Sequence, residues 1–380
     1  MTRTWDIFCS VVDNYGDIGV CWRLARQVTS ELRQPVRLWV DGLESFHAIC
    51  NAADPALPEQ DIDGVNVRRW TKAVPAVIPA DIVVEGFGVA LPAAYVDAMA
   101  ARSPRPVWIN LEYLSAEAWV EGCHGLPSPQ PNLPLVKYFF FPGFTPATGG
   151  LLVESGLVRA RDAFQNDPAA VASFWRTLGV APCAEAVKRV SLFCYENAAL
   201  PELVAAWSSG TAQFVCMVPV GKALAQMSTI VGRKIEPGAS VVRGQLTIQA
   251  IPFLDADQYD HLLWSCDVNF VRGEDSFVRA QLAARTMVWQ AYPQDESAHM
   301  AKVAAFADRY VAGMDGAAAE AVRTFYRDWN LQSGDTGRNW EALLARREAT
   351  AAHARAWAAD LATGGSLAIK LAEFCQDRLE

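Results

Sequence analysis

Histidine is scarce in this sequence, and the spacings by which histidine and cysteine bind zinc are missing. The five histidines (His47, His124, His261, His299 and His353) show no metal-ligand spacing, and HExxH does not occur. The nine cysteines include no CxxC pair, and most lie within apolar runs. We therefore expect reduced cysteines in the core and neither disulfides nor a metal site, as in a cytoplasmic protein.

Long apolar runs and basic tracts are missing as well. No stretch reaches the ~20 uninterrupted apolar residues of a membrane span, and the N-terminal MTRTWDIF has no apolar segment followed by an export cleavage site. The net charge of −9 argues against a protein that neutralises many nucleic-acid phosphates. We expect a cytoplasmic protein that binds neither nucleic acid nor membrane, although a local basic site for one diphosphate remains compatible with this charge.

Three common enzyme motifs, GxGxxG, GxxxxGKS/T and GxSxG, do not occur either. Their absence disfavours a dinucleotide-dependent dehydrogenase, a P-loop nucleotidase and a Ser-His-Asp hydrolase.

The residues that are present indicate two α/β domains. The chain has 380 residues, of which 52% are hydrophobic, enough for two separate cores. Apolar runs of strand length alternate with amphipathic stretches, which is typical of βαβ units and a parallel sheet. Strands are expected at 5–12, 36–40, 82–85, 107–110 and 136–141, and again at 190–194, 214–218, 246–251, 268–271 and 287–291. This alternation favours two Rossmann-like halves facing a cleft, with ligands at the carboxyl ends of the strands.

The loop SVVDNYGDIG, residues 10–19, joins the first strand to the first helix. Its Gly16 and Gly19 suit a tight turn, but Asp13 and Asp17 carry the wrong charge for a phosphate. Two carboxylates beside a helix start can instead receive a cationic group. Alternatively, Asp13 caps the turn and Asp17 caps the helix.

A second loop lies in VNFVRGEDSFVRAQLA, residues 268–283. A helix that starts at Ser276 would offer unpaired backbone N–H groups to an anion, Arg272 a planar donor fork, and Gly273 room for close approach. Glu274 would repel a phosphate but can accept hydrogen bonds from sugar hydroxyls. Alternatively, Asp275 or Ser276 caps the helix and Arg272 pairs with Glu274.

Aromatic and amide side chains follow the neighbouring strands: Tyr195, Phe253, Gln258 and Tyr292. Because the carboxyl ends of parallel strands share one edge of a sheet, these side chains are expected on one rim. An aromatic and amide pocket beside a phosphate site fits a nucleotide base and its diphosphate, although aromatic residues are also common in cores. The pattern favours a metal-independent enzyme that uses a sugar nucleotide.

Three segments closely resemble one family: DNYGDIGVCWRLAR, NLEYLSAE and RGEDSFVRAQLA followed by YPQDE. They are similar to the elongation factor P arginine rhamnosyltransferases, the EarP family, over residues 5–307. The resemblance implies a GT-B fold and inverting transfer of rhamnose from dTDP-β-L-rhamnose to an arginine of the N-terminal domain of elongation factor P. It also implies that no metal or other cofactor is needed.

The resemblance further implies roles for particular residues. The essential acids correspond to Asp13, Asp17 and Glu274. The donor pocket corresponds to Tyr195, Phe253, Gln258, Arg272, Gly273, Asp275, Ser276 and Tyr292. The loop residues Asn14, Tyr15, Gly16 and Gly19 would line the acceptor and sugar side, with Tyr15 standing where the family often has Phe.

The domain boundaries expected are an acceptor domain of residues 1–153 plus a returning helix at about 362–380, a linker at 154–183, and a donor domain at 184–361. Two other functions fit the residues less well but remain open from the sequence: a sugar-nucleotide epimerase of the same fold, and a nucleotide-gated protein that binds a translation factor.

Overall fold

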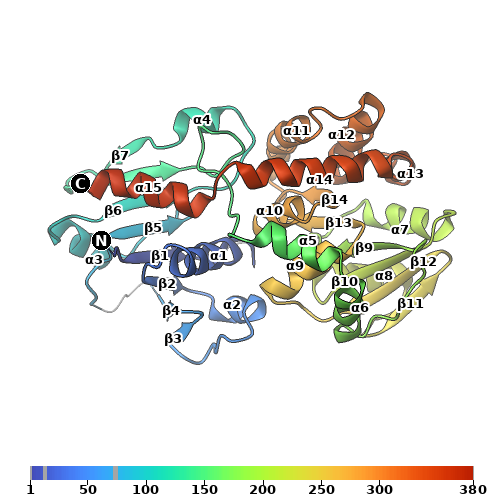
Figure 1. Ribbon diagram of the computed structural model, residues 1–380, viewed down its shortest axis with the longest axis horizontal. Helices are drawn as coiled ribbons and strands as arrows, with labels where there is room; N and C mark the ends of the chain where they lie inside the picture. Colours follow the sequence, from blue (N-terminus) through green and yellow to red (C-terminus); the bar gives the residue numbers. More distant parts are fainter. Residues whose placement is uncertain (1, 12–14, 72–75, 380) are drawn as a thin grey trace. The chain divides into compact units, whose positions relative to one another are not determined.

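The computed structural model describes residues 2–11, 15–71 and 76–379 (Figure 1). The chain divides into two compact units, Met1–Ser155 with Leu361–Glu380, and Gly156–Asp360. Residues 156–183, expected as a linker, fall in the second unit, where they form helices α5 (Leu157–Gln165) and α6 (Pro168–Thr177). The last helix, α15 (Leu367–Leu379), belongs to the first unit, and Ser366 just before it pairs with Leu151.

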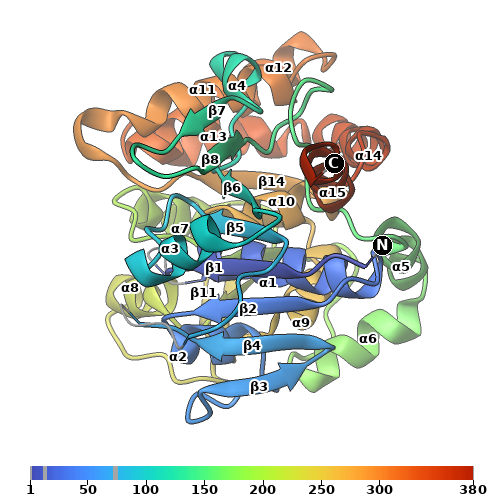
Figure 2. The same cartoon turned by 90° about the vertical axis from the view of Figure 1, so that its left-hand side faces the viewer.

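The first unit is built on an eight-stranded sheet with the order β3-β4-β2-β1-β5-β6-β8-β7 (Figure 2). The strands are β1 (Trp5–Cys9), β2 (Val36–Val40), β3 (Glu59–Ile62), β4 (Val65–Arg69), β5 (Ile82–Gly86), β6 (Val107–Leu111), β7 (Pro127–Pro129) and β8 (Val136–Phe140). All neighbours are parallel except the edge pairs β3/β4 and β7/β8. The central strands β1, β5 and β6 are buried throughout, as expected when both faces of a parallel sheet are covered.

The helices of the first unit are α1 (Gly16–Ser30), α2 (Leu43–Ile49), α3 (Ala93–Ala101), α4 (Trp119–Cys123) and α15. Helix α3 buries Tyr95 and Met99 in a cluster with Phe8 of β1 and Trp39 of β2. Helix α1 contacts strand β1 and helix α15, and α15 contacts strand β6. The sheet therefore holds the start of α1, and with it Asp17, in a fixed position.

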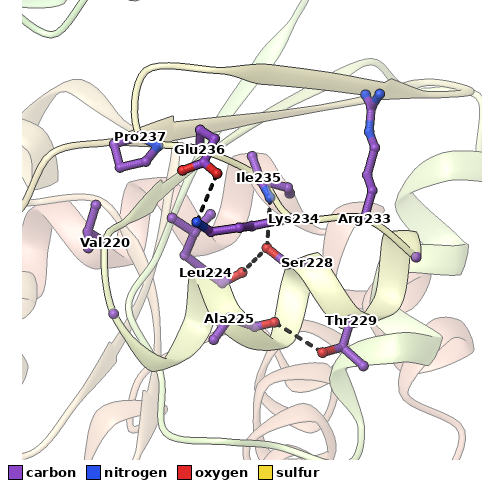
Figure 3. Close-up of a pocket in the computed structure, with 12 residues that line it drawn as sticks. Val220, Leu224, Ala225, Ser228, Thr229, Arg233, Lys234, Ile235, Glu236 and Pro237 are labelled. Carbon is purple, nitrogen blue, oxygen red and sulfur yellow. Dashed lines mark hydrogen bonds and ion pairs between the residues drawn. The ribbon is translucent and has the colours of Figure 1, made fainter.

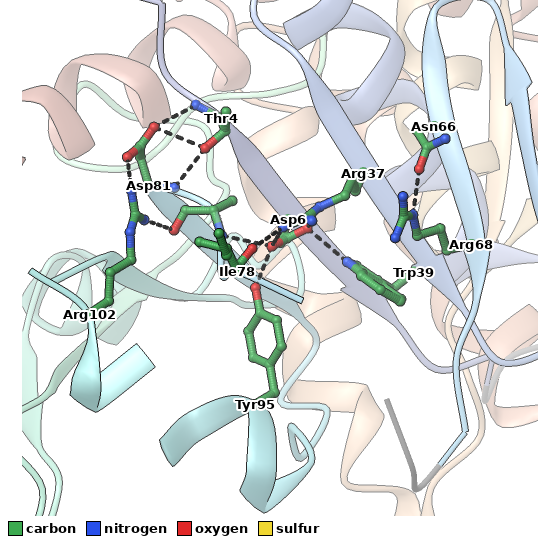
Figure 4. Close-up of polar contacts among 11 residues, drawn as sticks. Thr4, Asp6, Arg37, Trp39, Asn66, Arg68, Ile78, Asp81, Tyr95 and Arg102 are labelled. Carbon is green, nitrogen blue, oxygen red and sulfur yellow. Dashed lines mark hydrogen bonds and ion pairs between the residues drawn. The ribbon is translucent and has the colours of Figure 1, made fainter. Parts of the chain in front are cut away.

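A buried carboxylate, Asp6 of β1, ties this core together (Figure 4). Arg37 donates two hydrogen bonds of 2.6 Å to its two oxygens, and Trp39 donates one of 2.8 Å. The hydroxyl of Tyr95 and the backbone N–H of Ala80 also donate to Asp6. A fully buried charge is tolerated here because each oxygen accepts several hydrogen bonds and a cation balances it.

The second unit contains a six-stranded sheet with the order β11-β12-β10-β9-β13-β14. Its strands are β9 (Lys188–Leu192), β10 (Phe214–Pro219), β11 (Ser240–Arg243), β12 (Leu246–Ile251), β13 (Val268–Arg272) and β14 (Thr286–Gln290). Only the edge pair β11/β12 is antiparallel among these described strands. The carboxyl ends of five parallel strands therefore lie along one edge.

Helices cover both faces of this second sheet. After α5 and α6 they are α7 (Leu200–Ser209), α8 (Lys222–Val231), α9 (Ala256–Ser265), α10 (Asp275–Leu282), α11 (His299–Tyr310), α12 (Gly316–Leu331), α13 (Thr336–Leu344) and α14 (Arg347–Thr363). On one face, Trp175 of α6 and Leu262 of α9 pack with Met217 of β10. On the other, Trp207 of α7 and Trp340 of α13 pack against each other, with ring centroids 5.5 Å apart.

The expected strands all form, with ends that shift by a few residues. The strands at 36–40 and 246–251 have the expected limits, whereas β3, β4, β7 and β11 were not expected. Strands β3, β7 and β11 lie at the sheet edges and β4 lies next to the edge strand β3. All four include exposed positions, so they lack the apolar run that marks a central strand. All nine cysteines are free, and most are buried. Within the described ranges, no helix is both long and apolar enough to cross a bilayer.

Candidate active site

The residues expected to hold a nucleotide lie after the strands of the second sheet, at one edge. Tyr195 follows β9, Phe253 follows β12, Arg272 ends β13 and Tyr292 follows β14. Since β12, β10, β9, β13 and β14 are consecutive neighbours, the fold places these side chains along one rim, as ligand sites of open α/β sheets require.

Arg272 is the buried cation of this rim. It is only 7% exposed, and its guanidinium carbon lies 4.6 Å from the ring centroid of Phe193 and 4.4 Å from that of Tyr195. Such stacking fixes the plane of the donor fork before any ligand arrives. Burial raises the pKa of Cys194 to about 12, so the neighbouring thiol carries no negative charge at neutral pH.

Two further contacts position Tyr195, one of the aromatic residues of this rim. The Tyr195 ring meets the Tyr292 ring edge-on, with centroids 5.4 Å apart. The backbone N–H of Tyr195 donates to the side-chain oxygen of Gln290 at 2.9 Å. Tyr292 is 57% exposed and presents a ring to solvent. Sequence reasoning missed Phe193 and Gln290; Phe193 lies in the same run SLFCY as Tyr195, and that run was the available signal.

The turn from β13 into α10 is the loop that the sequence predicts to bind an anion. Gly273 adopts a left-handed φ of 67°. A residue with a side chain would be strained in this backbone conformation, whereas glycine is not. Its carbonyl accepts a 3.1 Å hydrogen bond from the Trp289 indole. The helix starts at Asp275, one residue before the expected start, and the Ser276 hydroxyl donates to the Arg272 carbonyl. The first turn of α10, whose backbone N–H groups have no acceptor within the helix, therefore begins three residues after Arg272.

Glu274 is the N-cap residue of α10, and its carboxylate pairs with a lysine that the sequence analysis did not identify. Lys302 of α11 places its Nζ 2.9 Å from Glu274 Oε1, and the two side chains are 23% and 13% exposed. Lys302 Nζ also lies 5.9 Å from the Trp289 ring. No local pattern could have paired residues 28 positions apart; the fold of α11 against β14 brings them together.

Helices α9 and α10 are joined by a buried ion pair. Arg279 of α10 donates from Nε and Nη2 to the two oxygens of Asp260 of α9, at 2.9 and 2.6 Å.

Gln258, in the first turn of α9, is exposed. It forms a capping box with Asp255, so its backbone N–H donates to Asp255 and its side-chain oxygen accepts from the Asp255 backbone. The structure thus gives Gln258 a local role in addition to the ligand role that the sequence suggested.

In the first unit, Asp17 lies in the first turn of α1 and is 1% exposed. The N-cap residue is Tyr15, so Asp17 lies inside the helix and does not cap it. The hydroxyl of Tyr113 donates to Asp17 Oδ1 at 3.3 Å. Gly16 begins the helix, and the N–H of Gly19 donates to the Tyr15 carbonyl at 2.9 Å. Asp13 and Asn14, the other predicted members of this loop, lie outside the described residues.

A separate pocket of about 690 Å³ lies beside α8 in the second unit (Figure 3). Leu224, Ser228 and Ile235 line it, as do Lys234 and Glu236, which form an ion pair at 2.9 Å. None of the described residues predicted to bind the nucleotide lines this pocket. In the described part of the chain, no three His, Cys, Asp or Glu side chains gather as metal ligands would.

Comparison with known proteins identifies close relatives over the full length. The family model described as "Elongation-Factor P (EF-P) rhamnosyltransferase EarP" matches residues 5–376. A protein-arginine rhamnosyltransferase of Pseudomonas putida is 49% identical over 380 residues, covering 100% of both chains. One of Pseudomonas aeruginosa is 45% identical, covering 99% of this chain and 100% of its own.

Comparison with solved structures gives the same family and also the fold class. A structure from work on EarP-mediated arginine glycosylation of translation elongation factor EF-P is 33% identical, covers 99% of both chains and has a TM-score of 0.70. MurG of Acinetobacter baumannii, a GT-B glycosyltransferase, is 11% identical with a TM-score of 0.50, covering 99% of this chain and 100% of its own. That second likeness shows the fold alone, and it confirms the expected GT-B class.

Proposed function

Since the chain belongs to the EF-P rhamnosyltransferase family EarP and is a protein-arginine rhamnosyltransferase, we propose that its donor is dTDP-β-L-rhamnose and its acceptor an arginine of EF-P. The acceptor arginine is assigned to the N-terminal domain of EF-P, and the transfer inverts the anomeric centre. The observation that carries the donor assignment is the Arg272–Ser276 turn, because it combines a stacked guanidinium with a helix N-terminus.

We assign the second unit to the donor and the first unit to the acceptor. The diphosphate binds Arg272 and the first turn of α10 at Asp275 and Ser276, while the base lies among Tyr195, Phe253, Gln258 and Tyr292. Glu274 accepts hydrogen bonds from hydroxyls of the rhamnose or ribose, and Lys302 holds its carboxylate for that purpose. Asp17 and Asp13 receive the arginine guanidinium in the first unit, where paired carboxylate oxygens suit its planar fork.

The reaction is an in-line displacement at the anomeric carbon of rhamnose. A guanidinium nitrogen forms the new bond to this carbon, and the bond to the diphosphate oxygen breaks on the opposite side. The electron pair of that bond leaves with dTDP. Arg272 and the α10 N-terminus stabilise the charge that grows on the diphosphate, which is the task a metal ion performs in other enzymes. We therefore propose that the reaction needs no metal or other cofactor.

The high pKa of the attacking guanidinium determines whether its proton leaves before or during formation of the C–N bond. Arginine has a pKa of ~12.5–13.8 and aspartate of ~3.9, a gap of about nine units. At ~1.36 kcal/mol per unit, complete deprotonation by Asp17 before attack would cost about 12 kcal/mol. Proton transfer to Asp17 therefore occurs late, when the forming C–N bond has acidified the nitrogen. Asp13 is assigned to orienting the guanidinium.

The test is transfer to purified EF-P with and without dTDP-β-L-rhamnose. We expect the intact mass of EF-P to rise by one deoxyhexose residue, at one arginine, with dTDP released in equal amount and with transfer persisting in a chelator. An epimerase would consume donor without EF-P, and a binding protein would consume neither. Consumption of donor that leaves the mass of EF-P unchanged would contradict the proposal.

The variants Asp17→Asn and Asp13→Asn distinguish which carboxylate acts as the general base. Asp17→Asn keeps the shape but cannot take a proton, so single-turnover transfer should fall by about 10²–10⁴-fold. The affinity for dTDP-rhamnose should hardly change, because the donor site is assigned to the other unit. Asp13→Asn should weaken EF-P binding as well as rate. Near-normal turnover by Asp17→Asn would leave Asp13 as the better base.

A further inference from the structure

Two stacked aromatic rings have no role in the assignment above: Tyr113, which contacts Asp17, and Phe87, which stacks on Tyr113. Phe87 follows strand β5, and Tyr113 follows strand β6. Strand β5 pairs with both β1 and β6, so the chain leaves the sheet toward α1, Phe87 and Tyr113 at neighbouring positions on one edge. The two rings are stacked, with centroids 4.4 Å apart and planes inclined by 16°.

The stack connects a buried carboxylate with solvent. Asp17 is 1% exposed, whereas Tyr113 is 37% exposed, and the Tyr113 hydroxyl donates to Asp17 Oδ1 at 3.3 Å. The Tyr113 hydroxyl thus links the ring stack, which is exposed at Tyr113, to the buried Asp17 carboxylate. Ring faces carry negative electrostatic potential and the carboxylate a full negative charge, so both attract a cation and repel an anion.

The backbone at Phe87 is held in a costly conformation. Its φ is 60°, a left-handed value that is an outlier for a bulky residue. The Phe87 N–H donates to the Leu111 carbonyl at 2.7 Å, and the next N–H, of Gly88, donates to Asn110 Oδ1 at 2.9 Å. Glycine would adopt this φ without strain, yet the position carries a large ring. Strain that neighbouring bonds maintain is a feature of functional sites.

We propose that Phe87 and Tyr113 form the platform on which the acceptor arginine stacks, while Asp17 receives its N–H groups. This inference rests on the proposed function and extends it to recognition of the acceptor. Tyr113 has a second task as a positioning residue, because its hydroxyl fixes the orientation of the Asp17 carboxylate. A planar guanidinium gains from a ring face and a carboxylate together, whereas a lysine ammonium fits the stack less well.

Steady-state kinetics of three variants test the platform. Phe87→Leu and Tyr113→Leu remove a ring, so the KM for EF-P should rise about 5–30-fold, the effect of one cation–π contact, while the KM for dTDP-rhamnose stays unchanged. Tyr113→Phe keeps the ring and loses the hydroxyl, so the KM for EF-P should stay within about twofold while kcat falls. Tyr138→Phe is the matched control, because that ring packs on Phe374 in the same unit, and it should behave as the parent.

A direct binding experiment separates this inference from the proposed function. L-arginine methyl ester and L-lysine methyl ester are titrated against the parent and the variants by saturation-transfer NMR, and thermal melting confirms that each variant is folded. The arginine probe should bind the parent better than the lysine probe and should lose that advantage in Phe87→Leu and Tyr113→Leu. This result would support the platform even if the parent failed to modify EF-P.

Three outcomes overturn the inference. One is a parent that transfers rhamnose to EF-P with the KM for EF-P unchanged in both ring-removing variants; the proposed function would then stand without the platform. A second is a change in the KM for dTDP-rhamnose in place of that for EF-P, which would assign the rings to the sugar. The third is an arginine probe that binds parent and variants equally or does not bind.

Discussion

Replacement of Arg279 by methionine is expected to destabilise the second unit strongly. Arg279 and Asp260 are 2% and 7% exposed and share two charge-assisted hydrogen bonds. Arg279→Met keeps the apolar stem and roughly the length of the side chain, so little cavity forms. The variant loses the cation beside the Asp260 carboxylate, which remains in a site that water hardly reaches.

The expected size follows from this burial. Removing one partner of a buried ion pair costs about 3–5 kcal/mol, because the remaining charge is uncompensated. In a unit of the size of Gly156–Asp360, each kcal/mol shifts the Tm by about 2–4 °C, so the Tm of this unit should fall by about 6–20 °C. The double variant Asp260→Leu/Arg279→Met removes both charges and should recover most of that loss.

Differential scanning calorimetry provides the measurement. The two units are expected to give separate transitions, and the transition of the second unit is identified as the one that dTDP raises. The reasoning is refuted if Arg279→Met lowers this Tm by less than about 2 °C. It is also refuted if the double variant melts as low as the single one, because the cost would then come from packing and not from an unpaired charge.

Four further outcomes are expected. Arg272→Ala should weaken dTDP binding in a chelator by about 1.5–3 kcal/mol in isothermal titration, the size of a charged hydrogen bond; unchanged affinity would remove Arg272 from the site. Glu274→Ala should lower kcat/KM for dTDP-rhamnose with a Tm close to that of the parent, and a large fall in Tm would show a structural role instead. Asp6→Asn should lower the Tm of the first unit by about 6–20 °C, since Arg37 keeps its charge while one acceptor becomes a donor. Burial raises the pKa of Glu85, although Lys137 opposes this. The parent therefore loses stability as the pH rises from the ordinary pKa of glutamate through the raised folded-state pKa. The Tm of Glu85→Gln relative to the parent should increase over that range, and a pH-independent difference would contradict the shift.

The central strands and the chemical character of both loops could be predicted from the sequence. Val36–Val40 and Leu246–Ile251 are apolar runs of strand length with turn residues around them, so their limits were expected. The edge strands could not be predicted in this way. Glu59–Ile62 alternates in exposure and is polar, and only its pairing with β4 makes it a strand.

In the candidate active site, too, some features could be predicted from the sequence and others depend on the tertiary structure. The sequence by itself determined which chemical groups lie at each strand end: Arg272 as the last residue of β13 with Gly273 and Ser276 after it, and Asp17 after β1. These groups are local to a strand-to-helix turn. Only the tertiary structure decided their partners. Arg272 stacks on rings that follow β9, Glu274 pairs with Lys302 of α11, and Asp17 accepts from Tyr113 after β6. These contacts join residues far apart in the chain, and their free energy depends on which strands are neighbours in the sheet, which no local pattern of residues encodes.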